Sequence, residues 1–208
     1  MKIAIVDYGM GNLRSVSKAL EHVAPQANVV VTADPEQVLT ADRVVFPGQG
    51  AMPDCIRELD RRGLRSAVIE CTRTRPFLGI CIGLQMLFER SEEGDVPGLK
   101  VLQGTVRRFR KEDMGAGRHK VPHMGWNEVV QSSSHALWRG ISDGARFYFV
   151  HSYYAFPAET RLICGSTEYG LTFCSAVARE NIFAVQFHPE KSQLSGLRLL
   201  SNFIEWNP

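Results

Sequence analysis

The sequence predicts an α/β fold: a central, mostly parallel sheet flanked by helices, with antiparallel strands added in the second half. Over roughly the first ninety residues, short apolar runs alternate with helical patterns, which is typical of parallel strands joined by helical crossovers. In the second half, strand-like runs are separated by short polar or glycine turns, which favours hairpins. A chain of 208 residues can bury a core without disulfides or metals. We therefore expect a single domain over residues 1–208.

The elements of the first half follow from apolar spacing and from the residues that end each pattern. Lys2–Asp7 begins with a short apolar run that predicts a buried strand. Asn12 is a suitable cap for a helix whose apolar residues recur at helical spacing until Pro25 ends it. Further strands are predicted at 28–32, 43–46 and 76–80, and helical patterns before about residue 73 and over 83–90.

The second half is read as a series of hairpins. Tyr169-Gly170 and Glu180-Asn181 are turn sequences between strand-like runs. An amphipathic helix over 196–206 ends the pattern, with Leu197, Leu200 and Phe203 on one face. The predicted strands are 101–109, 126–130, 146–156, 162–168, 171–179 and 182–187.

Composition and charge exclude several classes of protein. Apolar residues make up 44% and charged residues 22%, as in globular proteins, so a disordered, collagen-like or coiled-coil chain is excluded. The net charge of +2 gives no indication of nucleic-acid binding, and no apolar run approaches the ~20 residues of a membrane span. Five cysteines without a C-x-x-C pair favour reduced thiols, so we expect a cytoplasmic protein.

The most informative motif is Gly79-Ile80-Cys81-Ile82-Gly83, at a predicted strand-to-helix junction. It matches the nucleophile elbow G-x-S-x-G with cysteine in place of serine. A helix N-terminus favours a thiolate, and the backbone N–H of Ile82 would point toward a developing oxyanion. The competing interpretation is a buried, inert cysteine ahead of a helix.

A thiol nucleophile needs a base and a group that orients the base. His188 and Glu190 follow an apolar strand in Phe187-His188-Pro189-Glu190, and so are expected at the same sheet edge as Cys81. Pro47-Gly48-Gln49-Gly50 also follows a strand, and its glycines allow the backbone to approach a ligand. A surface histidine in a turn, and a plain turn between strand and helix, are the alternatives.

Three other features are less informative. Gly9-Met10-Gly11 begins like a dinucleotide fingerprint, but the third glycine position is Arg14. His119 and His123 are four residues apart, but Pro122 between them opposes the helix that would bring both to one zinc ion. The basic run 107–111 is typical of a solvated strand end.

Together, the Pro47-Gly48-x-Gly50, Gly79–Gln85 and His188-Pro189-Glu190 motifs resemble a class I (triad) glutamine amidotransferase over nearly the whole chain. The resemblance implies a flavodoxin-like core. Within that class, the strings Tyr8–Asn12, Val121–Asn127, Phe149–Tyr153 and His188–Ser192 resemble the glutaminase subunits of imidazole glycerol phosphate synthases, from histidine biosynthesis.

The resemblance implies roles for individual residues. Cys81 would attack the side-chain amide of L-glutamine to form a glutamyl thioester, His188 would transfer protons, and Glu190 would orient His188. No metal or organic cofactor is expected. The oxyanion donors would be backbone N–H groups of Gln49 or Gly50 and of Ile82. The residues that match glutamine-binding positions are Gly48, Gly50, Gln85, Glu93, Ser152 and Tyr153.

The resemblance also implies a partner. Family members form a 1:1 heterodimer with a (β/α)8 cyclase, which receives the ammonia; nucleic acid and membranes are not expected partners. Asn12, Met124, Trp126 and Lys191 match positions near the docking face. Gln49 departs from the small apolar residue common in the family, and we predict low glutaminase activity for the subunit alone.

Three alternatives remain open from the sequence. The chain could be a triad glutaminase that serves another synthase, of a pyridoxal phosphate or sugar-nucleotide pathway. It could be another cysteine hydrolase of similar fold, although such proteins typically lack counterparts of Gln85 and of the His188-Pro189-Glu190 unit. It could also be a catalytically silent interaction subunit, which the presence of Cys81 and its two partners argues against.

Overall fold

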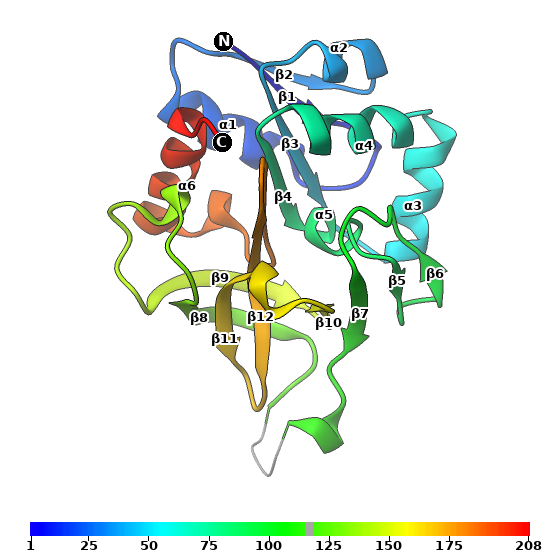
Figure 1. Cartoon of the computed structure of the whole chain (residues 1–208), viewed down its shortest axis with the longest axis vertical. Helices are drawn as coiled ribbons and strands as arrows, with labels where there is room; N and C mark the ends of the chain where they lie inside the picture. Colours follow the sequence, from blue (N-terminus) through cyan, green and yellow to red (C-terminus); the bar gives the residue numbers. More distant parts are fainter. Residues whose placement is uncertain (115–118) are drawn as a thin grey trace.

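The structure is a computed structural model that describes residues 1–114 and 119–208. A run of parallel strands forms one end of its main sheet (Figure 1). Their order is that of the flavodoxin-like doubly wound fold, as expected from the sequence. In spatial order these strands are β2 (Asn28–Thr32), β1 (Lys2–Val6), β3 (Arg43–Gly48), β4 (Phe77–Cys81) and β13 (Ile182–Val185).

Helices cover both faces of these parallel strands. The α-helices are α1 (Leu13–Val23), α2 (Pro35–Leu39), α3 (Met52–Arg61), α4 (Arg65–Thr74), α5 (Ile82–Gln85) and α6 (Gln193–Glu205). Helices α1 and α6 pack together, and α2 packs beside α4 (Figure 1). Asn12 caps α1 as predicted, because its Oδ1 accepts a hydrogen bond from the backbone N–H of Ser15. Short 3-10 turns lie at Lys111–Asp113, Ala136–Trp138, Thr160–Leu162 and Pro189–Lys191.

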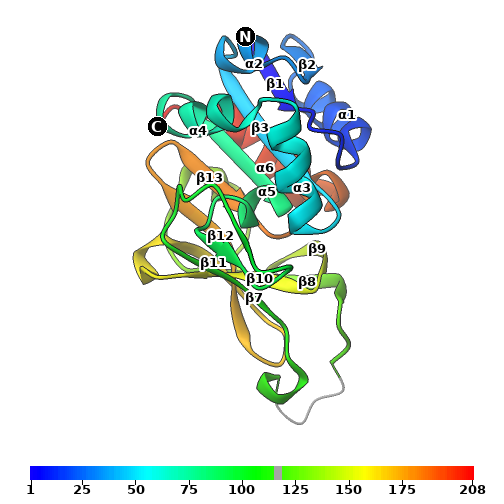
Figure 2. The ribbon, with the colours of Figure 1, turned by 90° about the vertical axis from the view of Figure 1, so that its right-hand side faces the viewer.

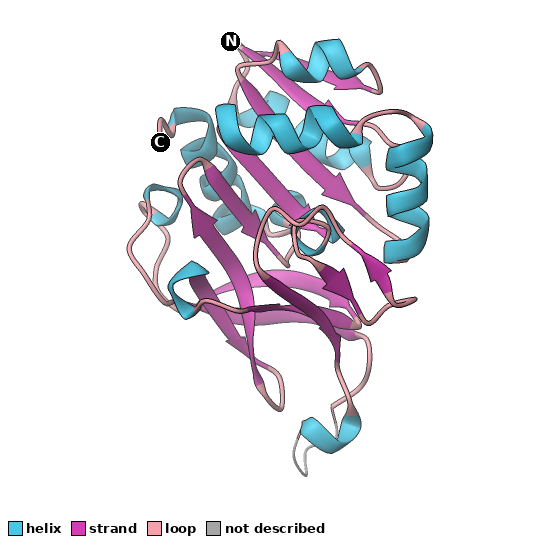
Figure 3. Ribbon diagram, turned by 45° about the vertical axis from the view of Figure 1, so that its right-hand side comes forward, coloured by secondary structure: helices cyan, strands magenta, loops and turns pink. Residues whose placement is uncertain are grey.

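Antiparallel pairing dominates the second half, as the turn sequences predict. The added strands are β5 (Arg90–Ser91), β6 (Val96–Pro97), β7 (Gly104–Arg108), β8 (His123–Gln131), β9 (Ala145–His151), β10 (Tyr153–Pro157), β11 (Ile163–Glu168) and β12 (Thr172–Arg179). Strand β13 joins the two halves, because it pairs parallel with β4 on one side and antiparallel with β12 on the other. Figures 2 and 3 show the antiparallel strands beyond the ends of the parallel ones.

Two predicted elements are wrong in extent. The helix expected over 83–90 ends at Gln85, because backbone N–H groups of residues 98–102 bond to the carbonyls of residues 86–89. The strand expected over 146–156 is divided at Ser152: β9 pairs with β8, whereas β10 pairs with β7 and β12. In both places, pairing with distant residues decides where the element ends.

The core lies on both faces of the parallel strands. Strands β3 and β4 are buried along their whole length, which explains why they appear in the sequence as continuous apolar runs. Their C-terminal ends point toward the antiparallel half (Figure 3). No helix in the described part of the chain combines the length and apolar character needed to cross a membrane.

Candidate active site

Cys81 is the last residue of β4 and lies at a sharp turn into α5, which begins at Ile82. Its φ of 55° is in the left-handed region, which is unusual for a residue other than glycine. Neighbouring groups approach so closely that the motif needs its two glycines. A Cβ on Gly79 would lie 2.9 Å from the Cβ of Ala184, and one on Gly83 only 1.8 Å from the carbonyl oxygen of Phe46. This is the strained strand-to-helix turn of a nucleophile elbow.

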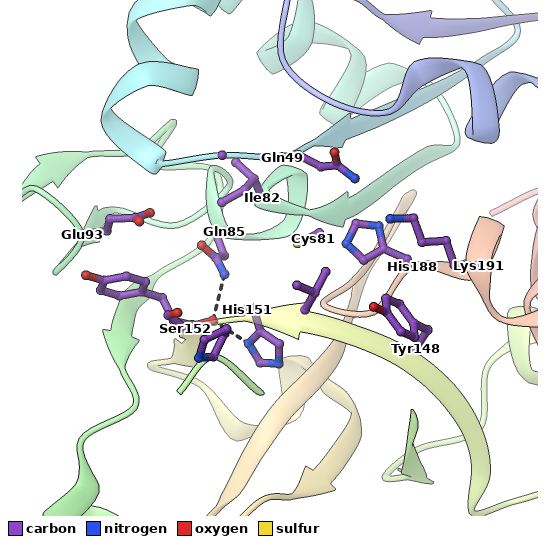
Figure 4. Close-up of a pocket in the computed structure, with 14 residues that line it drawn as sticks. Gln49, Cys81, Ile82, Gln85, Glu93, Tyr148, His151, Ser152, His188 and Lys191 are labelled. Atoms are coloured by element: carbon purple, nitrogen blue, oxygen red, sulfur yellow. Dashed lines mark hydrogen bonds between the residues drawn. The ribbon is translucent and has the colours of Figure 1, made fainter. Parts of the chain in front are cut away.

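His188 and Glu190 form a buried pair beside this turn. His188 Nδ1 lies 2.8 Å from Glu190 Oε1, and both side chains are 2% exposed. The His188 ring lies next to Cys81 (Figure 4). Burial lowers the pKa of His188, but the negative charge of a thiolate at Cys81, followed by the hydrogen bond to Glu190 and the charge of Glu190, raises it to about 10 overall. The arrangement therefore favours a protonated imidazole between the sulfur and the carboxylate.

A cavity of about 490 Å³ opens above Cys81, a size that suits a small molecule. It lies between the ends of the parallel strands and the β9–β10 segment (Figure 4). Most of the predicted site residues meet here, although they come from distant parts of the chain. The cavity is lined by Gln49, Gly50, Cys81, Ile82, Gln85, Glu93, Pro122, Tyr148, Val150, His151, Ser152, Tyr153, His188 and Lys191.

The remaining predicted residues are not among those that line this cavity. Glu190 is behind His188. Gly48 serves packing, because a Cβ there would lie 1.9 Å from the Tyr8 hydroxyl, which donates to the Pro47 carbonyl. Asn12 caps α1. Met124 and Trp126, both on β8, are 62% and 38% exposed.

Backbone N–H groups border the cavity near Cys81. Ile82 is the first residue of α5, so its N–H has no acceptor within the helix. Across from it, the turn at Gln49 and Gly50 is open to a ligand, and Gly50 has a φ of 101°. The Gln49 carbonyl accepts a 3.5 Å hydrogen bond from Cys55 Sγ. These groups can stabilise an oxyanion formed at Cys81.

Two residues predicted to bind glutamine are also tied to the surrounding structure. Gln85 Nε2 donates to the Tyr153 carbonyl at 2.9 Å. Glu93 Oε2 accepts a 2.8 Å hydrogen bond from the backbone N–H of Met52, the first residue of α3. Both side chains therefore have defined positions before any ligand is bound.

Sequence reasoning missed Gln186 and the role of His151 in the cavity wall. Gln186 is fully buried, and its Nε2 lies 3.7 Å from Cys81 Sγ. A polar residue within the apolar run Ile182–Phe187 was the available signal. His151 pairs with His123 at 3.0 Å, so His123 is engaged by a histidine that is distant in sequence, and not by His119.

The other four cysteines are buried and differ from Cys81 in their surroundings. Burial raises the pKa of Cys55 and Cys174 to about 12 and that of Cys71 to about 11, and it raises the pKa of Cys164 as well. Thiols of this kind are inert at neutral pH. Cys81 alone among the five combines a cavity position with a neighbouring histidine.

Comparison with known proteins agrees with this geometry. The sequence model of the class-I glutamine amidotransferases matches residues 4–206. Imidazole glycerol phosphate synthase subunit HisH of Dechloromonas aromatica is 65% identical over 99% of this chain and 97% of its own length. The subunit of the same name from Aromatoleum aromaticum is 63% identical over 99% of both chains.

Solved structures support the fold at low sequence identity. A glutamine amidotransferase structure has a TM-score of 0.72 at 17% identity and covers 97% of both chains. A glutamine amidotransferase from Thermotoga maritima has a TM-score of 0.61 at 18% identity, over 91% of this chain and 76% of its own. With the sequence relatives, these findings show that the chain belongs to the class-I glutamine amidotransferases and, among them, to the family of imidazole glycerol phosphate synthase subunits HisH.

Proposed function

We propose that this chain is the glutaminase subunit of an imidazole glycerol phosphate synthase and hydrolyses L-glutamine to glutamate and ammonia. The observation that carries the proposal is the strained Cys81 turn with the buried His188–Glu190 pair beside it. Nucleophile, base and orienting carboxylate thus stand in the order that covalent amide hydrolysis requires. The high identity to subunits named HisH supports the assignment to this synthase.

The first half of the reaction forms a thioester. Cys81 Sγ attacks the side-chain amide carbon of glutamine, and the carbonyl oxygen becomes an oxyanion near the N–H of Ile82 and the turn at Gln49 and Gly50. His188 then donates its proton to the amide nitrogen, the C–N bond breaks, and ammonia leaves. Glu190 holds Nδ1 of the ring at 2.8 Å throughout, so the other ring nitrogen remains directed at the reacting atoms.

The second half releases glutamate. His188, now neutral, takes a proton from a water molecule, which attacks the thioester carbon. The tetrahedral intermediate collapses, the C–S bond breaks, and the sulfur leaves as the thiolate that began the cycle. Gln85, Glu93 and Ser152 border the cavity on the side away from His188 (Figure 4). Together with Tyr153, which also lines the cavity, they would hold the amino-acid end of the substrate.

The ammonia is used by a partner. We infer a 1:1 heterodimer with a (β/α)8 cyclase, which makes imidazole glycerol phosphate and an aminoimidazole carboxamide ribonucleotide in the cytoplasm. Exposed Trp126 packs edge-on against Tyr148 at a ring distance of 6.2 Å, and Lys191 Nζ lies 5.8 Å from the Tyr148 ring centre. Tyr148 and Lys191 line the cavity, so a partner that covers Trp126 would contact the cavity wall.

The test measures glutamate release from glutamine by the purified chain, alone and with the matching cyclase and its nucleotide ligand. Low activity alone and large stimulation in the complex, both lost in Cys81→Ala, are expected. Cys81-dependent activity that ignores the cyclase would keep the glutaminase chemistry but indicate another synthase. A lack of activity in both conditions would contradict the proposal.

A further inference from the structure

A pair of buried histidines lies at the cavity, outside the Cys81–His188–Glu190 group: His151 is part of the cavity wall, and His123 is not. His123 on β8 and His151 on β9 are directly opposed in the antiparallel pairing, and their side chains meet with His123 Nδ1 3.0 Å from His151 Nε2. The residues are 2% and 6% exposed. His123 is stacked between the rings of Phe149 and Tyr169. A polar pair in such surroundings must have its hydrogen bonds satisfied.

Two backbone carbonyls determine where the protons of this pair lie. His151 Nδ1 is 2.8 Å from the Tyr153 carbonyl oxygen, which can only accept, so Nδ1 carries the proton. In a neutral ring, His151 Nε2 is then an acceptor, and His123 Nδ1 must donate to it. His123 Nε2 therefore accepts, and its neighbour at 3.3 Å is Asn127 Nδ2.

Asn127, at the other end of this series of hydrogen bonds, independently gives the same proton positions. Asn127 Nδ2 lies 2.8 Å from the Glu168 carbonyl oxygen, which fixes this atom as the amide nitrogen and hence as a donor. Each residue in the series therefore donates to the next: Asn127 to His123, His123 to His151, and His151 to the Tyr153 carbonyl. Burial also lowers the pKa of His123 to about 4 and that of His151 to about 3, so both rings are neutral at pH 7.

The Tyr153 carbonyl connects the two histidines to a side chain of the cavity wall. It also accepts from Gln85 Nε2 at 2.9 Å, and Gln85 Nε2 donates in addition to Gln186 Oε1 at 3.0 Å. The nitrogen of Gln186 then faces Cys81 Sγ. Gln85 Oε1 is left buried without a partner among the described residues, and Gln85 lines the cavity. An unpaired acceptor in a cavity wall is suited to an N–H donor of a ligand.

We propose that His151, supported by His123, is a positioning residue for glutamine binding: it holds the Tyr153 carbonyl, and this carbonyl fixes the Gln85 amide with its oxygen toward an N–H donor of the substrate. This inference rests on the proposed glutaminase function. If His151 did not hold the carbonyl, Gln186 Oε1 would be the one fixed acceptor left for the Gln85 nitrogen, and the Gln85 oxygen would be held less firmly toward the substrate's donor. His151 touches no reacting atom, so its loss affects glutamine recognition more than thiol reactivity.

The test compares two reagents for Cys81 in the complex with the cyclase. The glutamine analogue 6-diazo-5-oxo-L-norleucine needs the amino-acid subsite, whereas iodoacetamide needs only a reactive thiol. In His151→Leu we expect labelling by the analogue to slow and KM for glutamine to rise, each about tenfold as for one lost hydrogen bond. Labelling by iodoacetamide and kcat should change much less.

His151→Asn is the matched control, because an asparagine nitrogen takes nearly the place of Nδ1 and can still donate to the Tyr153 carbonyl. It should restore labelling by the analogue to near wild type. Equal labelling of wild type and His151→Leu by the analogue, or equal slowing by both reagents, would overturn the inference. If wild type itself were not labelled by the analogue, the proposed function would fail instead.

A measurement without substitution covers the case in which His151→Leu does not fold. Nitrogen-15 NMR of the histidine-labelled complex reports the tautomer of each ring. Both His123 and His151 are expected as neutral rings with the proton on Nδ1 at pH 7. A proton on Nε2 of His151, or a charged ring at either position, would contradict the proposed hydrogen-bond chain.

Discussion

The two walls of the cavity are built on different principles. The wall from the parallel strands presents backbone: the strained Cys81, the N–H of Ile82 and the turn at Gln49 and Gly50. The wall from the antiparallel strands presents side chains whose donors and acceptors are fixed by one another, from Asn127 to His151, and the Tyr153 carbonyl connects them to Gln85 on α5. Each wall should therefore respond to a different kind of substitution.

The two walls would have different tasks in the proposed reaction: one holds the nucleophile and the oxyanion donors, and the other holds the amino-acid end of glutamine. On the backbone wall, an added Cβ at a glycine is damaging, whereas many side-chain changes leave the N–H donors in place. On the side-chain wall, replacements of equal volume are damaging when they reverse a donor and an acceptor. His188 connects the two walls. It follows parallel strand β13, and its backbone N–H donates to the Tyr148 carbonyl of antiparallel strand β9.

The largest expected effect is that of Glu190→Gln. The amide would keep the volume but remove the charge that favours a protonated ring, and its nitrogen could donate to His188 Nδ1 and so stabilise the wrong tautomer. We expect kcat in the complex to fall about a thousandfold or more, as when the carboxylate of a triad is neutralised. Steady-state glutamate release measures it, with Glu112→Gln on the exposed 3-10 turn as the control. A loss below tenfold would separate Glu190 from the triad.

Gly83→Ala should act on stability. Its Cβ would lie 1.8 Å from the Phe46 carbonyl oxygen, and such overpacking costs about 1–3 kcal/mol or more. At Gly63 a Cβ would meet nothing within 4 Å, and only the φ of +67° opposes alanine, so Gly63→Ala should cost roughly 1 kcal/mol. Urea unfolding of both variants measures the difference. Equal losses would mean that the turn around Cys81 can relax.

The contrast between the two walls also explains which site residues could be predicted from the sequence. Cys81, His188 and Glu190 belong to short motifs that follow strands, and neighbouring parallel strands end at one edge, so their meeting could be inferred. The pairing of His123 with His151 depends on the register between β8 and β9 and on the change of strand partner at Ser152, which local patterns do not contain. Gln186 follows β13 at the same edge as Cys81, and the signal that sequence reasoning missed was its polar side chain within an apolar run.

The third prediction concerns acid stability. Burial lowers the pKa of His151 in the folded state to about 3, whereas the pKa of an unfolded histidine is about 6.5. Because the unfolded chain then holds more protons, the free energy of unfolding should decrease as pH falls from 6.5 toward 3, by about 2 kcal/mol from His151 alone at pH 5. Urea unfolding at pH 7 and pH 5 measures this decrease.

His151→Asn is again the control for this pH dependence, because it keeps the hydrogen bond and removes the titrating ring. Its loss of stability between pH 7 and pH 5 should be smaller than that of wild type, while contributions from His123 and His135 remain in both. Identical losses in the two proteins would show that His151 takes up no proton on unfolding in this range.

The smallest effect is expected for Gln49→Val, the change toward the small apolar residue common in the family. Gln49 lines the cavity, and its backbone carbonyl accepts from Cys55 Sγ, a contact that does not involve the Gln49 side chain. Loss of one oxyanion donor costs about a hundredfold in rate or more, so a variant that keeps every N–H should change glutamate release by less than about threefold. The assay is run with and without the cyclase. A change above tenfold in either condition would show that the side chain, and not only the peptide, controls this turn.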